Sequence, residues 1–357
     1  MNKKITSFLL AIVIALSFSG CDQQPGVNNP NTQTQQPNVN QLQLSQELVV
    51  MPQDGKLPLI NLINSAKQSV DIVVYELEDD SKDKAANIAE ALVAAKKRGV
   101  SVRVIINGFN KANSYEKWAK VFLDSNRIDY RVATKKFVYT HQKTTIIDNN
   151  KAFIGTFNYV DTKKTSYFSG TRDFAIITAE ADEVKDVVAV FEADWKNAAD
   201  QTRITPELTA QSLVFSPVNA REKLSALIKS ARKTLYSYQQ EMGDLNSRNE
   251  GLCRDIADAG DRGVDVRVIC SDMDGNLREI EYLRKHQVKV EVVTASKQNL
   301  YIHAKVYIVD GTIAELGSIN MTTNSIEHNR ELGIISVNPK IVAQLTEIFM
   351  ADWKKYE

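Results

Sequence analysis

The sequence of 357 residues predicts an α/β protein made of two duplicated α-β-α halves, whose mixed sheets pack around one shared site. Two observations predict this class. The same landmarks recur in the same order in both parts of the chain, which indicates an internal duplication. Within each part, stretches with helical periodicity alternate with strand-like stretches, a pattern that favours parallel strands with flanking helices.

The internal repeat is visible in the letters of the sequence. Residues 98–105 read RGVSVRVI and residues 262–269 read RGVDVRVI. Both parts also end alike, with FEADW at 191–195 and FMADW at 349–353. Gene duplication explains these matches better than coincidence. We therefore expect a first half at residues 46–203 and a second half at residues 204–357.

The predicted elements follow the same order in both halves. Predicted helices show apolar residues at helical spacing, and Gly99 and Gly263 each stand where a helix should stop. Predicted strands are runs rich in β-branched residues. The expected order is helix 59–67, strand 70–75, helix 88–97 and strand 100–106, then helix 224–231, strand 235–239, helix 252–261 and strand 264–269.

Each half then contains a predicted hairpin that carries one copy of a motif. The hairpins span residues 136–154 and 300–316 and should turn at Asn149-Asn150 and Asp310-Gly311. Each copy reads H-x-K-x4-D, and six residues separate its Asp from a Gly-hydroxyl-x-Asn tail. Two copies with the same tail at the same distance are very unlikely to arise by chance. Their polar residues are His141, Lys143, Asp148, Thr156 and Asn158 in the first half, and His303, Lys305, Asp310, Ser318 and Asn320 in the second.

The motif residues are suited to breaking phosphate esters. Residues two apart on a strand point to one face, so each His should lie beside its Lys. Two halves that face each other supply two imidazoles, one to attack phosphorus and one to protonate the leaving oxygen. The lysines, with Thr156, Asn158, Ser318 and Asn320, would hold the non-bridging oxygens. This scheme needs no metal or other cofactor.

The paired motif with its tail resembles the signature of the phospholipase D superfamily, and the resemblance covers residues 45–357. It implies a phosphohistidine intermediate, with His141 as the expected nucleophile and His303 as the general acid by analogy with most members. It also implies that Asp148 and Asp310 support the local architecture. Thr156 replaces the Ser of the family pattern and keeps the hydroxyl.

In this family a carboxylate further along the chain usually bonds the catalytic His and selects its tautomer. Asp173 fits that place in the first half, and Glu331 fits it in the second. Glu76 and Glu241 occupy matching positions at strand ends. Either they lie near the cleft, or they are solvated or cap helices.

The N-terminus predicts export and membrane attachment. Residues 1–20 read as a lipoprotein signal peptide, because an apolar run too short to span a bilayer follows Lys3 and Lys4. Cys21 stands where lipoproteins carry their acyl chains, and an ordinary signal peptide with a chance Cys is the alternative. Residues 21–45 form an Asn/Gln/Pro-rich tether without a core. We expect a bacterial envelope lipoprotein, at the inner membrane facing the periplasm if Asp22 acts as a sorting signal.

Three substrate hypotheses compete. The anchor and the balance of 44 basic against 44 acidic residues favour a phospholipid, hydrolysed or transferred to another alcohol. Tyr167 and Phe168 could then touch the lipid interface. An exported nuclease is the alternative, with residues 135–139 as a basic-aromatic patch for a strand. A non-catalytic binding lipoprotein is the third. We expect a monomer with two pseudo-equivalent halves, in which Cys253 and Cys270 are either bonded or buried free thiols.

Overall fold

The computed structural model describes residues 45–83, 86–245 and 251–357. The predicted signal peptide, Cys21 and all but the last residue of the predicted tether lie outside the described residues. Both cysteines of the folded part, Cys253 and Cys270, are buried free thiols, so the disulfide alternative is wrong. Within the described ranges, no helix is both long enough and apolar enough to cross a membrane.

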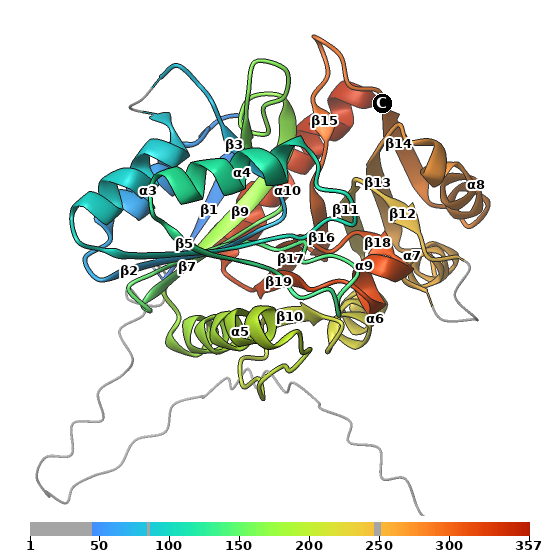
Figure 1. The fold of residues 1–357 in the computed structure, drawn as a ribbon. Coiled ribbons are helices and arrows are strands. Elements are labelled where there is room, and N and C mark those ends of the chain that lie inside the picture. Colours follow the sequence, from blue (N-terminus) through green and yellow to red (C-terminus); the bar gives the residue numbers. More distant parts are fainter. Residues whose placement is uncertain (1–44, 84–85, 246–250) are drawn as a thin grey trace, which may run out of the picture. The chain divides into compact units, whose positions relative to one another are not determined.

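The first half is a mixed sheet with helices (Figure 1). Its elements are β1 (Gln46–Met51), α2 (Leu57–Ser65), β2 (Ser69–Val74), β3 (Leu77–Asp79), α3 (Ile88–Lys97), β4 (Ser101–Ile106), α4 (Ser114–Ser125), β5 (Asp129–Val132), β6 (Lys143–Ile147), β7 (Lys151–Gly155), β8 (Tyr159–Asp161), β9 (Thr171–Thr178) and α5 (Ala181–Asp200). The strand order is β1-β9-β7-β6-β2-β4-β5. Strands β2, β4 and β5 are parallel, and the others join antiparallel.

The second half repeats this order with its own elements. They are β10 (Leu213–Ser216), α6 (Ala220–Ser230), β11 (Thr234–Gln239), β12 (Met242–Gly243), α7 (Leu252–Asp261), β13 (Asp265–Ser271), η2 (Asp274–Asn276), α8 (Leu277–Lys285), β14 (Lys289–Val293), β15 (Tyr301–Ile302), β16 (Lys305–Val309), β17 (Ile313–Gly317), β18 (Met321–Thr322), α9 (Thr323–Glu327), β19 (Glu331–Ser336) and α10 (Pro339–Tyr356). The strand order β10-β19-β17-β16-β11-β13-β14 matches the first sheet strand for strand. The predicted duplication is confirmed.

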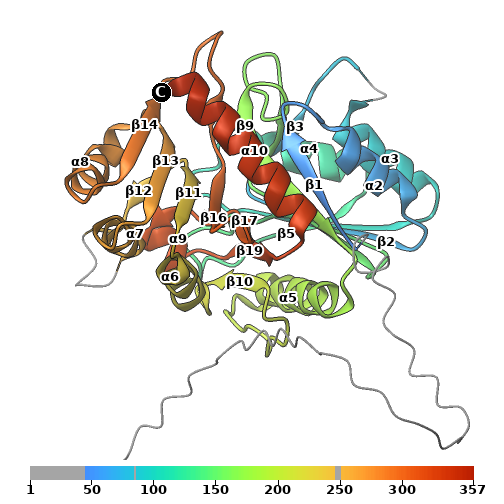
Figure 2. The same cartoon turned by 180° about the vertical axis from the view of Figure 1, so that it is seen from behind.

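The two sheets share one core. Buried residues of β2, β4 and β6 pack with residues of β11, β16, α5 and α10 in a single apolar cluster that joins both halves. Figure 1 shows α5 below the sheets, and Figure 2 shows α10 crossing in front of them. Two outer clusters lie beneath α2, α3 and α4 in the first half, and beneath α6, α7 and α8 in the second. The short strand β15 of the second half also pairs with β9 of the first.

The predicted elements agree with the structure most closely where a stop signal is present. Helices α3 and α7 have the predicted bounds, and Gly99 and Gly263 follow them with φ of +86° and +85°. Glycine adopts this left-handed conformation without steric cost, which is why it ends the helix. The hairpins β6-β7 and β16-β17 turn at the predicted positions. The other predicted ends shift by a few residues.

Candidate active site

Both motif histidines lie outside the strands on which they were predicted. Strand β6 begins at Lys143 and β16 begins at Lys305, so each His precedes its strand by two residues. The backbone N–H of His141 donates to the carbonyl of Arg330 at 2.8 Å, and that of His303 donates to the carbonyl of Arg172 at 3.3 Å. The histidine backbone is therefore bonded to the opposite half instead of to its own sheet.

The motif aspartates support the architecture, as the resemblance implied. Asp148 accepts hydrogen bonds from three successive backbone N–H groups, those of residues 67–69, at 2.6 to 3.1 Å. Asp310 does the same with residues 232–234. Burial works to raise the pKa of Asp148, but these backbone donors outweigh it and lower the pKa. Each Asp thus ties the hairpin turn to the start of β2 or β11.

The carboxylates predicted to bond the histidines do so across the two halves. His141 Nδ1 lies 2.8 Å from Glu331 Oε2, and His303 Nδ1 lies 3.0 Å from Asp173 Oδ1. The assignment of each carboxylate to its own half was therefore wrong. Each carboxylate directly follows the Arg whose carbonyl holds the other half's His. The backbone hydrogen bond between each His and the Arg of the other half therefore also places the next residue, the carboxylate, beside that imidazole.

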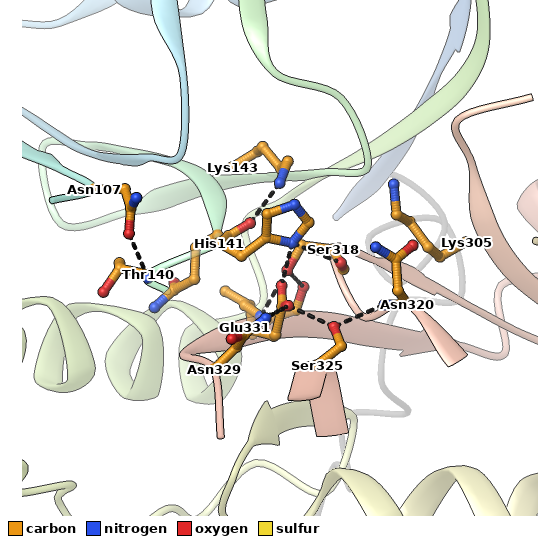
Figure 3. Close-up of polar contacts among 12 residues, drawn as sticks. Asn107, Thr140, His141, Lys143, Lys305, Ser318, Asn320, Ser325, Asn329 and Glu331 are labelled. Carbon is orange, nitrogen blue, oxygen red and sulfur yellow. Dashed lines mark hydrogen bonds and ion pairs between the residues drawn. The ribbon is translucent and has the colours of Figure 1, made fainter. Parts of the chain in front are cut away.

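Glu331 is held by its own neighbours. Its Oε1 accepts from Ser325 Oγ at 2.5 Å and from Asn329 Nδ2 at 3.0 Å. Figure 3 shows Glu331 between His141 above it and these two residues below. Burial works to raise the pKa of Glu331, but His141 and Lys143 outweigh it and lower the pKa. An ionised carboxylate only accepts, so His141 must donate its Nδ1 hydrogen, which leaves a lone pair on Nε2.

The two motif hydroxyls do not point at a substrate phosphate, contrary to prediction. Thr156 Oγ1 donates to Asp173 Oδ1 and accepts from the Phe174 N–H at 3.0 Å. Ser318 Oγ bonds the backbone of Leu332, at 3.1 Å to its N–H and 3.3 Å to its carbonyl. Both side chains are fully buried. These hydroxyls hold β9 and β19, the strands that carry Asp173 and Glu331. They can do so because the tail of each motif runs beside one of these strands.

The two motif lysines are buried beside their histidines. Lys143 Nζ donates to the His141 carbonyl at 2.5 Å, and Lys305 Nζ donates to the His303 carbonyl at 2.5 Å. Lys305 also donates to Gln240 Oε1 at 2.6 Å. Burial lowers the pKa of Lys305 to about 8 and holds that of Lys143 well below its ordinary value. Burial therefore disfavours the charged form of both lysines, and a bound anion would stabilise that form.

Both imidazoles are neutral at neutral pH. Burial lowers the pKa of His141 to about 4, although the Glu331 charge opposes the shift. Burial likewise lowers the pKa of His303 to about 3 against the opposing charge of Asp173. Water that would stabilise an imidazolium is excluded, and this effect exceeds the attraction of the carboxylates. A bound phosphate anion would stabilise the imidazolium form and so raise the pKa of each histidine.

Aromatic side chains flank both histidines, and the sequence predictions missed this role. The ring of Tyr75 lies edge-on to His141 with centroids 4.5 Å apart, and Tyr167 lies 4.7 Å from His303 in the same way. Phe168 is buried in the outer core of the first half, so it cannot touch a lipid interface as predicted. The residue equivalent to Tyr75 in the second half is Gln240. Comparing the repeats therefore gave no signal for this tyrosine.

The asparagines of the two motif tails bond to the strand-end glutamates. Asn158 Nδ2 donates to Glu76 Oε2 at 2.8 Å, and Asn320 Nδ2 donates to Glu241 Oε2 at 3.2 Å. Glu241 lines the cleft, and Glu76 lies beside the motif residues Asn158 and Lys143, which decides between the two alternatives left by the sequence. A cavity of about 530 Å³ opens here, and its lining includes Tyr75, Tyr139, His141, Glu241, Asn320 and Ser325.

The predicted basic-aromatic patch at residues 135–139 is only partly exposed. Lys135 and Lys136 face solvent, and Tyr139 is 38% exposed. Phe137 is buried, with the guanidinium of Arg330 at 4.7 Å from its ring centroid. Its ring thus packs on a buried charge and cannot stack on a nucleotide base. The patch offers one aromatic ring instead of two.

The chain is similar to known proteins over both halves. The family described as cardiolipin synthase, PLD-like domain, matches residues 59–195 and 224–353. A cardiolipin synthase 2 of Bacillus cereus is 21% identical over 82% of this chain, which spans only 62% of that relative's length.

Two solved structures share the fold. The phosphatidylserine synthase of Haemophilus influenzae has a TM-score of 0.63 and 14% identity, covering 87% of this chain and 86% of its own. The polyphosphate kinase of Porphyromonas gingivalis has a TM-score of 0.64 and 16% identity, covering 90% of this chain and 49% of its own. The family match takes in most of both halves, including both motifs and the carboxylates Asp173 and Glu331. The chain belongs to the phospholipase D superfamily, within its cardiolipin synthase-type PLD-like domain family.

Proposed function

We propose that this protein is a phosphodiesterase of the phospholipase D type that transfers or hydrolyses phosphatidyl groups through a phosphohistidine, without a metal. The observation that carries the proposal is the crossed pair of dyads. His141 is oriented by Glu331 and His303 by Asp173, and the charges of the two buried lysines, Lys143 and Lys305, act on both imidazoles. One dyad can act as nucleophile while the other acts as acid and base.

The first step forms a bond between His141 Nε2 and phosphorus. The bond from phosphorus to the leaving alcohol breaks, and that alcohol's oxygen takes a proton from protonated His303. In the second step His303 removes a proton from water or an incoming alcohol, whose oxygen attacks phosphorus and releases His141. The bound phosphodiester anion supplies the charge that allows His303 to hold its proton, although burial lowers the pKa of His303 to about 3.

The surroundings of the two imidazoles support His141 as the nucleophile. Lys305 Nζ lies 3.3 Å from Nε2 of His303. Among the described residues, Nε2 of His141 has no hydrogen-bond partner, and His141 lines the cavity. A lone pair that is not engaged by an ammonium group is the better nucleophile.

The phosphatidyl part of the proposal is supported by the relatives. One similar protein is a cardiolipin synthase, and a solved structure with the same fold is a phosphatidylserine synthase. We further propose that Cys21 anchors the protein to a membrane of the bacterial envelope, which would place the site near lipid. The buried Phe137 ring weakens the case for a nuclease.

The test compares substrates on the full-length protein in detergent, with a divalent chelator present throughout. Vesicles of phosphatidylcholine and phosphatidylglycerol are offered in one arm, and plasmid or single-stranded DNA in the other. We expect release or exchange of the head group and intact DNA. DNA cleavage without lipid turnover would replace this proposal by the nuclease.

The two histidines can be separated in the same assay. His141→Ala and His303→Ala should each lose at least about a hundredfold in rate, the range for removing a nucleophile or general acid. With bis(p-nitrophenyl) phosphate, whose leaving group departs without a proton, His303→Ala should accumulate a phosphoryl adduct, detected by mass spectrometry on the peptide containing His141. An adduct on His303 in the His141→Ala variant would reverse the assignment.

A further inference from the structure

One position beside the motif lysine differs between the two halves. In the first half, the residue of β2 that lies opposite Lys143 is directly followed by Tyr75. In the second half, the residue of β11 that lies opposite Lys305 is directly followed by Gln240. Tyr75 and Gln240 therefore occupy equivalent places, and both are half-buried. The duplicated site thus has an aromatic ring in one half where the other half has an amide.

Gln240 holds the ammonium group of Lys305 through a chain of hydrogen bonds. Its Oε1 accepts from Lys305 Nζ at 2.6 Å, and its Nε2 donates to Tyr301 Oη at 3.0 Å. The amide oxygen must face the lysine, because an ammonium group can only donate. Lys305 Nζ also lies 3.3 Å from Nε2 and 3.5 Å from Nδ1 of His303. Gln240 therefore holds a cation against the ring of His303.

Tyr75 does not hold Lys143 in this way. Lys143 Nζ lies 5.1 Å from the centroid of the Tyr75 ring, and this ring packs edge-on against His141. Tyr139, the equivalent of Tyr301, packs on Tyr75 with centroids 5.7 Å apart. Within the described residues, Lys143 donates to the His141 carbonyl and forms no hydrogen bond with the imidazole. Packed rings therefore replace the hydrogen-bonded chain of the second half.

This difference changes what each imidazole can do. A histidine that attacks phosphorus becomes positively charged as its lone pair forms the new bond. The ammonium group held at the ring of His303 opposes that charge. The same group makes protonated His303 a stronger acid, since burial and Lys305 lower its pKa to about 3 against the opposing charge of Asp173. The charge of Lys143 acts on His141 without contact to its ring, so the Nε2 lone pair stays available.

We propose that Gln240 is a positioning residue that holds the Lys305 ammonium against the ring of His303. The contrast with Tyr75 makes His303 the general acid and leaves His141 as the nucleophile. The inference rests on the proposed phosphohistidine reaction and names the group that makes its two histidines unequal. The proton transfers of that reaction are unchanged, because Gln240 acts only through Lys305.

The first test follows Lys305 through the pH dependence of kcat/KM for bis(p-nitrophenyl) phosphate, measured on the full-length protein. Gln240→Met removes the acceptor at similar length, and Gln240→Glu replaces it by a carboxylate. An acceptor favours the charged ammonium, so the fall in kcat/KM near pH 8 should move down by about one pH unit in Gln240→Met and up in Gln240→Glu.

The controls for this test keep the rest of the site constant. The other ionisable groups that face Lys305 are the same in every variant, namely His303, Lys143, Asp173, Glu331 and Glu241. Gln344→Met is the same substitution on the exposed side of α10, and it should leave the fall at the wild-type pH.

The second test compares the two histidines after Tyr75 and Gln240 have been exchanged. Bis(p-nitrophenyl) phosphate has a leaving group that needs no proton, so a variant with the nucleophile but without the acid still releases a burst of nitrophenol. In the otherwise unchanged protein, His303→Ala should show this burst and His141→Ala should not. In the Tyr75→Gln/Gln240→Tyr protein, His141→Ala should show the larger burst, with the phosphoryl adduct on the peptide containing His303.

The outcomes separate this inference from the proposed function. A fall that stays near pH 8 in both Gln240 variants, or moves in the same direction in both, would show that Gln240 does not hold Lys305. An exchanged protein that folds and still shows the burst only with His303→Ala would overturn the inference. If the exchange abolishes the thermal unfolding transition, the single Gln240 variants decide. If neither alanine variant of the unexchanged protein gives a burst or an adduct, the proposed function fails first and this inference fails with it.

Discussion

His141 Nδ1 of the first half lies 2.8 Å from Glu331 Oε2 of the second half, and the pseudo-equivalent contact joins His303 to Asp173 at 3.0 Å. Neither half can orient its own histidine. The two halves thus depend on each other for chemistry as well as for burial of their shared core.

The crossed dyads predict the effect of removing a carboxylate charge. Glu331→Gln keeps the size of the side chain but no longer favours the Nδ1–H tautomer of His141, so kcat should fall about 10² to 10⁴-fold. The measurement is hydrolysis of bis(p-nitrophenyl) phosphate. Glu347→Gln should retain the wild-type rate. A Glu331→Gln variant with wild-type kcat would show that the contact is dispensable for the reaction.

Two buried ion pairs also cross between the halves. Arg330 Nη2 lies 2.8 Å from Asp194 Oδ1, and Arg172 Nε lies 2.6 Å from Asp352 Oδ2. Asp194→Ala leaves the guanidinium buried without its charge partner and should lower the free energy of unfolding by about 3–5 kcal/mol in urea titrations.

The control for this ion pair is Asp200→Ala, at the exposed end of α5, which should change the free energy of unfolding by about 0.5 kcal/mol or less. Adding Arg330→Met to Asp194→Ala should recover part of the loss, because the unpaired charge is then removed. A double variant less stable than Asp194→Ala alone would show that the charge is not the source of the cost.

The loss of activity at alkaline pH should follow the deprotonation of Lys305. Its ammonium binds phosphate only when protonated, and burial lowers its pKa to about 8. The kcat/KM value, which reports the free enzyme, should therefore fall as the pH rises through about 8. Lys305→Arg stays charged over this range, so the fall near pH 8 should disappear even if the maximal rate is lower. An unchanged alkaline limb in that variant would assign it to another group.

Glu315 of β17 is a buried carboxyl outside the site, opposite Tyr307 of β16. Burial raises its pKa to about 8 from an ordinary value of 4.5, so the folded protein holds a proton there that the unfolded chain releases. The stability associated with this proton is complete below pH 4.5 and is lost as the pH rises through 8. The change is on the order of a few kcal/mol.

Glu315→Gln tests this titration by removing it. The variant should gain stability relative to wild type between pH 5 and pH 9, followed as the difference between the two Tm values. A difference that stays constant over this range would show that Glu315 does not titrate there. Glu347→Gln, an exposed carboxyl on α10, should show no such trend.

The proposed anchor at Cys21 predicts the cellular fraction. Acyl chains on Cys21 would bind a membrane firmly, since each buried methylene contributes about 0.8 kcal/mol. Cys21→Ser should move the protein from the membrane to the soluble fraction and abolish incorporation of labelled palmitate. A variant that stays with membranes would exclude acylation as the anchor.

Local patterns in the sequence were sufficient for the elements that were predicted and for the duplication. The apolar periodicity of 88–97 and 252–261, with a glycine after each, specifies helices that end where predicted, because only the local backbone is involved. The repeated motif likewise identified His141, Lys143, His303 and Lys305, and the architectural role of Asp148 and Asp310 followed from the resemblance. Each of these predictions uses the spacing of residues within one continuous stretch of the chain.

The pairing of groups within the site depended on how the halves pack. Asp173 and Glu331 were identified as residues but assigned to the wrong histidines, and Thr156 and Ser318 were assigned to the phosphate instead of to strands β9 and β19. In a duplicated chain, contacts within one half and contacts between halves have the same sequence pattern. The sequence by itself determined the motif residues and the two carboxylates of the site, but not the flanking Tyr75. Only the tertiary structure decided which imidazole each carboxylate meets, because that choice is made by the shared core and the backbone bridges between the two halves.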